Sequence, residues 1–149
     1  MYDSAFETKQ HIESVRENLS ECWSNIIIRA LNHDCSKLHE PEKNTFDKFT
    51  PKLKGSTYGS DEYKQFLADM GPALQHHYEN NSHHPEHFEN GISGMSLFDL
   101  LEMLADWKAA TMRHANGNIQ DSLKINAKRF VISDQLVEIL QNTLKEMKW

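Results

Sequence analysis

The spacing of apolar residues constrains the fold more than any other feature of the sequence. It repeats every three or four positions along nearly the whole chain, as expected for helices that bury one face. The alternation of apolar and polar residues that is typical of strands is almost absent. The apolar positions of the first predicted helix are Ile12, Val15, Leu19, Trp23, Ile26 and Ala30. The sequence therefore predicts an all-α protein, an irregular bundle of about six to seven helices.

Helix start and stop signals divide the chain into segments. Ser4 and Glu7 are spaced as a capping box at the start of the first helix, and Gly71-Pro72 should interrupt a helix further along. Residues 51–60 and the histidine-rich segment 81–95 are expected to be loops. The helices expected from these signals span residues 4–33, 41–49, 61–70, 72–80, 96–117, 120–130 and 133–148.

The size and charge of the chain narrow the classes of protein that it can belong to. Its 149 residues suit a single domain, residues 1–149, and the 26% charged and 38% hydrophobic residues are typical of a folded protein. No apolar run approaches membrane-spanning length, and the N-terminus lacks the pattern of a signal peptide, so we expect a cytoplasmic protein. With a net charge of −6 and no evident basic face, we expect no long nucleic acid partner and no membrane. The oligomeric state stays open.

The histidines are unevenly distributed. Five of the nine lie between residues 76 and 87, and His33 stands beside Asp34, with Lys37 three residues further on. His11 lies at the edge of the apolar stripe of the first helix, where it suits either a core position or a metal ligand. Helical phasing turns His77 toward the apolar side of its helix and His76 away from it.

The helix predicted to begin at Ser96 is apolar around most of its circumference, which indicates a central position. Its narrow polar stripe contains Asp99, Glu102, Asp106 and Arg113. We expect Asp99 and Glu102 to face solvent. Asp106, midway along the helix between Ala105 and Trp107, is expected to be a buried metal ligand, because a buried carboxylate needs a partner.

Together these residues predict a metal site. Imidazole nitrogens and carboxylate oxygens suit divalent transition metals such as iron, manganese, zinc, cobalt or nickel. Structural zinc sites usually show closely spaced cysteine pairs, and Cys22 and Cys35 form none. Mixed histidine and carboxylate ligation therefore favours a catalytic site with open coordination positions.

The ordered set of these residues resembles the HD-domain metal-dependent phosphohydrolase superfamily, and in particular its dinuclear, HD-GYP-like branch. The likeness consists of His11, the run His33-Asp34-Cys35-Ser36-Lys37, the run His83-His84-Pro85-Glu86-His87-Phe88-Glu89-Asn90-Gly91, and a late Asp106 on a helix. The Gly-Tyr-Pro signature of that branch is replaced by Gly91-Ile92-Ser93-Gly94. The layout is also similar to small uncharacterised HD-like proteins of phage and bacterial genomes.

The resemblance implies a role for each of these residues. Asp34 would bridge two metal ions, and Lys37 would face a substrate phosphate, with Arg113 as a further substrate contact. The first ion would be completed by His11, His33 and Asp106, and the second would be held by His77, His83 and His84. Glu7 would be an additional ligand or only a helix cap.

The function predicted from these roles is hydrolysis of a phosphate ester in a small nucleotide-like molecule by metal-activated water, with Lys37 and Asp34 as catalytic residues. Two alternatives stay open. One is a di-iron oxygenase of the same superfamily, which would use the same ligands. The other is a non-catalytic module that binds a nucleotide or a partner protein.

Overall fold

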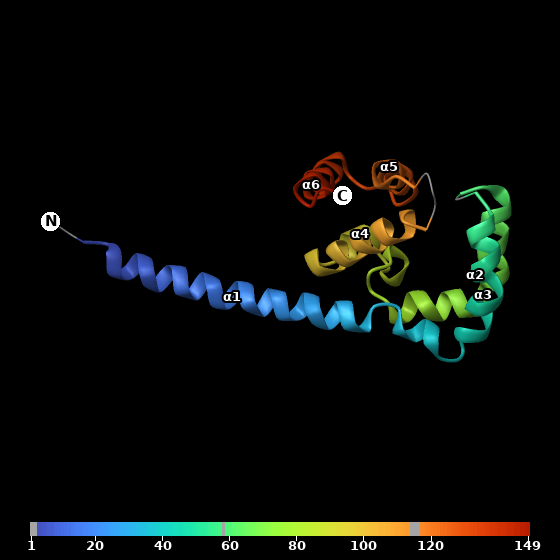
Figure 1. Cartoon of the computed structure of the whole chain (residues 1–149), viewed down its shortest axis with the longest axis horizontal. Coiled ribbons are helices and arrows are strands. Elements are labelled where there is room, and N and C mark those ends of the chain that lie inside the picture. Colours follow the sequence, from blue (N-terminus) through green and yellow to red (C-terminus); the bar gives the residue numbers. More distant parts are fainter. Residues whose placement is uncertain (1–2, 58, 114–116) are drawn as a thin grey trace. The chain divides into compact units, whose positions relative to one another are not determined.

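The computed structural model describes residues 3–57, 59–113 and 117–149. Over these residues it contains six α-helices, three short 3-10 helices and no strand, so the all-α prediction is confirmed (Figure 1). The chain divides into two compact units, residues 1–33 and 34–149, each described by itself below. Within the described ranges, no helix is both long enough and apolar enough to cross a membrane.

The first unit is a single helix, α1 (Ala5–Asn32), which runs without a break and has no buried residue. The capping box predicted at its start is wrong, because the side chain of Ser4 makes no capping hydrogen bond. Asp3 Oδ1 instead accepts a hydrogen bond from the backbone N–H of Ala5 at 2.9 Å. His33 follows the helix as its C-terminal cap residue.

The second unit contains the other helices and forms an irregular bundle. In chain order they are η1 (Cys35–Leu38), α2 (Lys43–Gly55), α3 (Asp61–Asn80), η2 (Pro85–His87), η3 (Gly91–Gly94), α4 (Leu97–Thr111), α5 (Ile119–Arg129) and α6 (Asp134–Glu146). Helix α2 packs on α3, and α5 packs on both α4 and α6. The apolar core that joins α4, α5 and α6 consists of Leu104, Ile119, Leu123, Leu140 and Leu144.

Helix α2 is longer than the sequence predicted. Residues 51–55, expected to be part of a loop, form its last turn even though Pro51 lies inside the helix, and Tyr58 of that expected loop lies outside the described residues. The Lys52 ammonium lies over the rings of Phe49 and Phe66, 4.9 and 5.6 Å from their centroids. The contact with Phe66 joins α2 to α3 next to the proline, which removes one hydrogen bond from the helix.

The predicted interruption of α3 is confirmed. Gly71 has φ 43° and ψ −117°, a left-handed conformation that glycine adopts readily, and Pro72 follows it at the start of the second half of the helix. Helix α4 begins after Ser96, as predicted, and Ser96 and Asp99 form a capping box there. Helix α4 ends at Thr111, before the expected end near Gly117, and residues 114–116 lie outside the described chain.

Candidate metal centre

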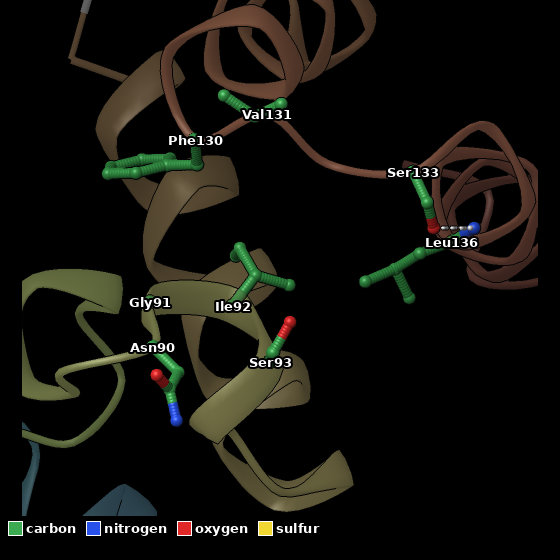
Figure 2. A pocket seen from close by; sticks show the side chains of 8 residues that line it. All are labelled: Asn90, Gly91, Ile92, Ser93, Phe130, Val131, Ser133 and Leu136. Carbon is green, nitrogen blue, oxygen red and sulfur yellow. Dashed lines mark hydrogen bonds between the residues drawn. The ribbon is translucent and has the colours of Figure 1, made fainter.

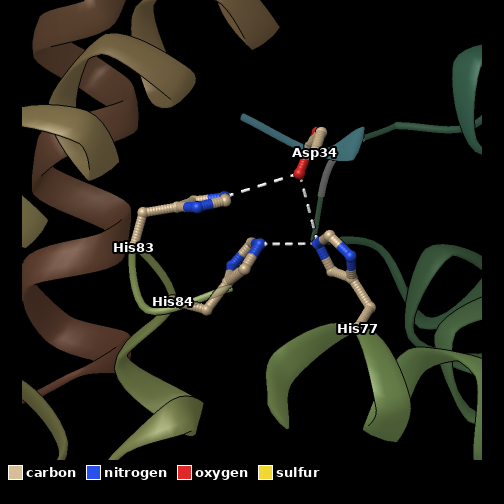
Figure 3. A group of neighbouring side chains, drawn as sticks. All are labelled: Asp34, His77, His83 and His84. Atoms are coloured by element: carbon tan, nitrogen blue, oxygen red, sulfur yellow. Dashed lines mark hydrogen bonds and ion pairs between the residues drawn. The ribbon is translucent and has the colours of Figure 1, made fainter. Parts of the chain in front are cut away.

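Four side chains of the second unit converge on one point: Asp34, His77, His83 and His84 (Figure 3). Each offers one donor atom, and the four atoms all lie within 4.8 Å of one another. The Nε2 atoms of His77 and His84 are 2.9 Å apart. Asp34 Oδ1 lies 3.4 Å from His77 Nε2 and 3.6 Å from His83 Nε2. Ligands about 2.0–2.2 Å from one ion in octahedral or tetrahedral geometry are separated by about 2.8–3.6 Å, so these side chains could hold a metal ion.

Three local structures place the four candidate ligands. Asp34 precedes η1 in a left-handed conformation with φ 57°, which aspartate adopts more readily than most residues. His77 lies in the half of α3 that begins after the Gly71 kink, and its position therefore depends on that kink. His83 and His84 lie between α3 and η2, which opens with the buried Pro85.

Asn81, the cap residue that follows α3, connects that helix to η1. Its Nδ2 donates to the backbone oxygen of His77 and to Ser36 Oγ, both at 2.8 Å. These bonds satisfy a carbonyl at the end of the helix and bring η1, which follows Asp34, against the helix that carries His77. The asparagine thus supports the arrangement of two predicted ligands without being one of them.

Burial keeps two of the imidazoles neutral. The side chain of His77 is 1% exposed, and this burial, with a further contribution from the nearby Lys37 charge, lowers its pKa to about 4. Burial, followed by repulsion from His83 and His77, lowers the pKa of His84 to about 3, although the Asp106 carboxylate opposes that shift. Both rings are therefore neutral near pH 7, the form in which an imidazole nitrogen can bind a metal.

Lys37 lies beside the cluster. Its Nζ is 2.6 Å from Asp34 Oδ2, the carboxylate oxygen that does not approach the histidines, and 5.1 Å from the centroid of the Phe46 ring. Phe46 in turn packs edge-on against His77, with 5.4 Å between ring centroids. The ammonium is thus held next to the predicted ligands by a carboxylate and an aromatic face.

Two further carboxylates, those of Glu42 and Glu102, contact the Nδ1 atoms of the histidines, on the side of each ring that faces away from the cluster. Glu42, just before α2, is completely buried and lies 2.9 Å from His77 Nδ1 and 2.7 Å from His76 Nδ1. On α4, Glu102 Oε1 lies 3.2 Å from His83 Nδ1. Glu42, Glu102, Asp34 and Asp106 thus place several carboxyl groups close together. The nearby Lys37 ammonium offsets one negative charge. A divalent cation would offset two more.

A separate cleft of about 430 Å³ lies between η3 and the connection from α5 to α6 (Figure 2). Its described lining includes Ile92, Phe130 and Leu136 and contains no carboxylate, histidine or basic side chain. This lining offers none of the metal-binding side chains that gather at the histidine cluster, so the cluster is the better candidate for the predicted metal site.

Comparison with known proteins gives one informative result. The sequence model of DUF5662, described as a family of unknown function, matches residues 1–146. The chain belongs to DUF5662. No curated protein and no solved structure matches it significantly.

In this DUF5662 protein, four of the predicted ligands meet in the second unit, and two lie in the first. His11 and Glu7 are exposed on α1, and His33 is the cap residue after that helix. The metal-binding roles of these three residues stay predictions. Asp106 is partly buried on α4, one turn after Glu102, and influences the pKa of His84. Arg113, the predicted substrate contact, is exposed just after α4, and its role also stays a prediction.

Sequence reasoning placed His76 and His77 of this DUF5662 protein as the structure does. His77 joins the cluster, whereas the side chain of His76 is 38% exposed. The expectation that Asp99 and Glu102 face solvent is wrong. Asp99 is buried and accepts a hydrogen bond from Ser82 Oγ at 2.6 Å, because the segment that carries the histidines packs over this side of α4.

No signal in the sequence indicated that Glu42 contacts a histidine, and Glu102 was wrongly expected to face solvent. Glu42 meets His77 across 35 positions of the chain, so no helical periodicity connects the two residues. For Glu102 a signal was present, since a carboxylate stripe on an otherwise apolar helix follows a histidine-rich segment. The carboxylates of such a stripe can accept hydrogen bonds from imidazoles as well as from water, so Glu102 did not have to face solvent.

Proposed function

We propose that this protein is a metal-dependent phosphohydrolase that acts on a phosphate ester of a nucleotide-like small molecule. The observation that carries the proposal is the convergence of Asp34, His77, His83 and His84. A mixed set of imidazoles and a carboxylate is typical of catalytic transition-metal sites that retain open positions. The resemblance to HD-domain phosphohydrolases supports the same reaction class and the presence of two ions.

In the proposed reaction, the imidazoles of His77, His83 and His84 and the Oδ1 atom of Asp34 would hold the metal. A bound divalent ion lowers the pKa of a water molecule toward neutrality and polarises a phosphoryl oxygen. Asp34 has a second task, because its Oδ2 holds the Lys37 ammonium at 2.6 Å.

Lys37 supplies positive charge for the phosphate. An ammonium group has three N–H donors, so Lys37 can keep its bond to Asp34 while donating to a phosphate oxygen. Its position over the Phe46 ring limits the directions that its side chain can take. As negative charge grows on the phosphate in the transition state, this fixed ammonium stabilises it.

The test combines elemental analysis with an activity screen. The purified protein is analysed for bound metals, and then nucleotides, phosphomonoesters and phosphodiesters are offered with manganese or iron supplied. The informative variant is Asp34→Asn, because asparagine has the same size, tolerates a left-handed backbone and lacks the charge. The matched control is Asp121→Asn on the surface of α5, where the side chain is 65% exposed.

We expect phosphate release by the natural protein and by the control, and a loss of at least about 100-fold in the Asp34→Asn protein with its helical circular dichroism retained. Equal turnover by the Asp34→Asn protein would contradict the role of Asp34. Metal-loaded protein that releases no phosphate from any member of the panel would overturn the proposed reaction. Consumption of oxygen during substrate loss would indicate an oxygenase instead.

A further inference from the structure

The contacts of Glu42 determine which nitrogen of His77 carries its proton. Glu42 is 0% exposed, and its carboxylate lies within hydrogen-bonding distance of three groups: Ser36 Oγ at 3.0 Å, His76 Nδ1 at 2.7 Å and His77 Nδ1 at 2.9 Å. An ionised carboxylate only accepts hydrogen bonds, and a completely buried one is costly unless donors surround it. Asn81 Nδ2 also lies 3.0 Å from His77 Nδ1, but its two N–H groups donate to the His77 carbonyl and to Ser36 Oγ. The three groups around Glu42 therefore donate to it, and the proton of His77 lies on Nδ1.

This assignment leaves the lone pair of His77 on Nε2. That atom faces the cluster, 2.9 Å from His84 Nε2 and 3.4 Å from Asp34 Oδ1. A ring with the opposite tautomer would present an N–H to the centre and could not bind an ion there. Ser36 also receives the Asn81 amide at 2.8 Å, which fixes the hydroxyl that donates to Glu42.

The same arrangement occurs a second time. The Nδ1 of His83 lies 3.2 Å from Glu102 Oε1, and its Nε2 lies 3.6 Å from Asp34 Oδ1. Glu102 comes from α4 and Glu42 from the start of α2, so two separate elements each place one carboxylate behind one histidine. In both pairs Nδ1 faces a glutamate, and Nε2 faces the same aspartate oxygen.

We propose that Glu42 and Glu102 are positioning residues that hold His77 and His83 in the Nδ1–H tautomer and thereby direct both Nε2 atoms at one metal ion. This inference rests on the proposed metal centre, since it assigns a task to residues that would not bind the ion. Carboxylates behind metal-binding histidines also raise the basicity of the ring, and removing such a partner commonly weakens metal binding about 10–100-fold. A buried acid with a structural role alone would leave the tautomer unchanged on substitution.

The experiment uses Glu42→Gln and Glu102→Gln, with Glu138→Gln as the matched control, because Glu138 is exposed on α6. Two quantities are measured on the full chain: the tautomers of His76, His77 and His83 in the metal-free protein by nitrogen-15 NMR, and the affinity for Mn²⁺ and Zn²⁺ by equilibrium dialysis. A glutamine amide offers one oxygen where the carboxylate offered two. At position 42 it must also turn an N–H₂ group toward a donor, which disfavours Nδ1–H in one of the two histidines.

We expect His77 and His83 to be Nδ1–H in the natural protein and in the control. In the Glu42→Gln protein either His77 or its neighbour His76 should lose Nδ1–H, and in the Glu102→Gln protein His83 should lose it, with about 10–100-fold weaker metal binding in each variant. If both variants keep the tautomers and the affinity of the control, the proposal is overturned. The side chain of Glu102 is 15% exposed, so Glu102→Gln supplies the result if Glu42→Gln does not fold.

The tautomer measurement needs no metal, and the two proposals can therefore fail separately. A natural protein that binds no metal but shows Nδ1–H at His77 and His83 would overturn the metal centre and leave the carboxylate contacts standing. A natural protein that binds metal with Nε2–H in its metal-free state at both histidines would overturn the positioning role alone.

Discussion

The metal-free protein should lose stability as the pH falls from 7.5 to 5.0, because two histidines are buried in their neutral form. Burial lowers the pKa of His77 to about 4 and that of His84 to about 3, while an unfolded chain titrates its histidines near the ordinary value of 6.5. In this pH range the unfolded state therefore binds more protons than the folded state. Stability must then rise with pH across the range and fall as the solution is acidified.

The size of the effect follows from these values. At pH 5.0 an unfolded histidine is almost fully protonated, whereas a folded one with a pKa of about 4 or lower is mostly neutral. The linkage relation then gives a loss of up to about 2 kcal/mol for each of the two residues between pH 7.5 and 5.0. The loss is a large part of the stability of an ordinary domain, about 5–15 kcal/mol.

Urea unfolding followed by circular dichroism measures this loss, with a chelator present and the pH varied in steps. In the His84→Gln protein the drop between pH 7.5 and 5.0 should shrink by up to about 2 kcal/mol. His39→Gln is the matched control, because His39 is exposed after η1, and its pH dependence should match that of the natural protein. A flat stability curve in the natural protein, or equal slopes in all three proteins, would show that buried neutral histidines do not cause the pH dependence.

Two substitutions test how the fold supports the site. Gly71→Ala should destabilise the protein by about 1–3 kcal/mol, because φ 43° with ψ −117° suits glycine alone. It should also weaken metal binding, because His77 lies in the same helix. An unchanged urea midpoint and an unchanged metal affinity would contradict this role for the kink. Leu144→Ala should lower the free energy of unfolding by about 2–5 kcal/mol, because Leu144 is 0% exposed in the core of α4, α5 and α6. A loss below about 1 kcal/mol in urea unfolding would show that this core is not well packed.

Local signals in the sequence predicted much of the fold. The Ser96–Asp99 box and Ser133 begin helices where expected, and Gly71 interrupts α3, because caps and glycine breaks act over only a few residues. Residues 51–55 were mispredicted because Pro51 and Gly55 are typical of loops, whereas in the structure these residues extend α2 and Lys52 contacts Phe66 of α3. That contact joins two helices and leaves no periodic trace at Pro51.

In the candidate site too, the features set by nearby residues were predictable from the sequence, and the contacts between distant residues were not. The inward orientation of His77 followed from the phase of its own helix, and His83 and His84 were recognisable as neighbours in a polar segment. The partners behind the rings were not predictable in this way. Glu42 reaches His77 only because η1 and α3 are brought together by Ser36 and Asn81, and Glu102 faces His83 rather than water because the chain folds back over α4.

The most direct test of the account is equilibrium dialysis of the metal-free protein against Mn²⁺ and Zn²⁺, with bound metal counted by elemental analysis. We expect saturable binding by the natural protein and by the His39→Gln control, and binding at least about 100-fold weaker when both His77 and His84 are replaced by glutamine. Equal binding by the double variant, or no saturable binding by the natural protein, would contradict the proposed metal centre.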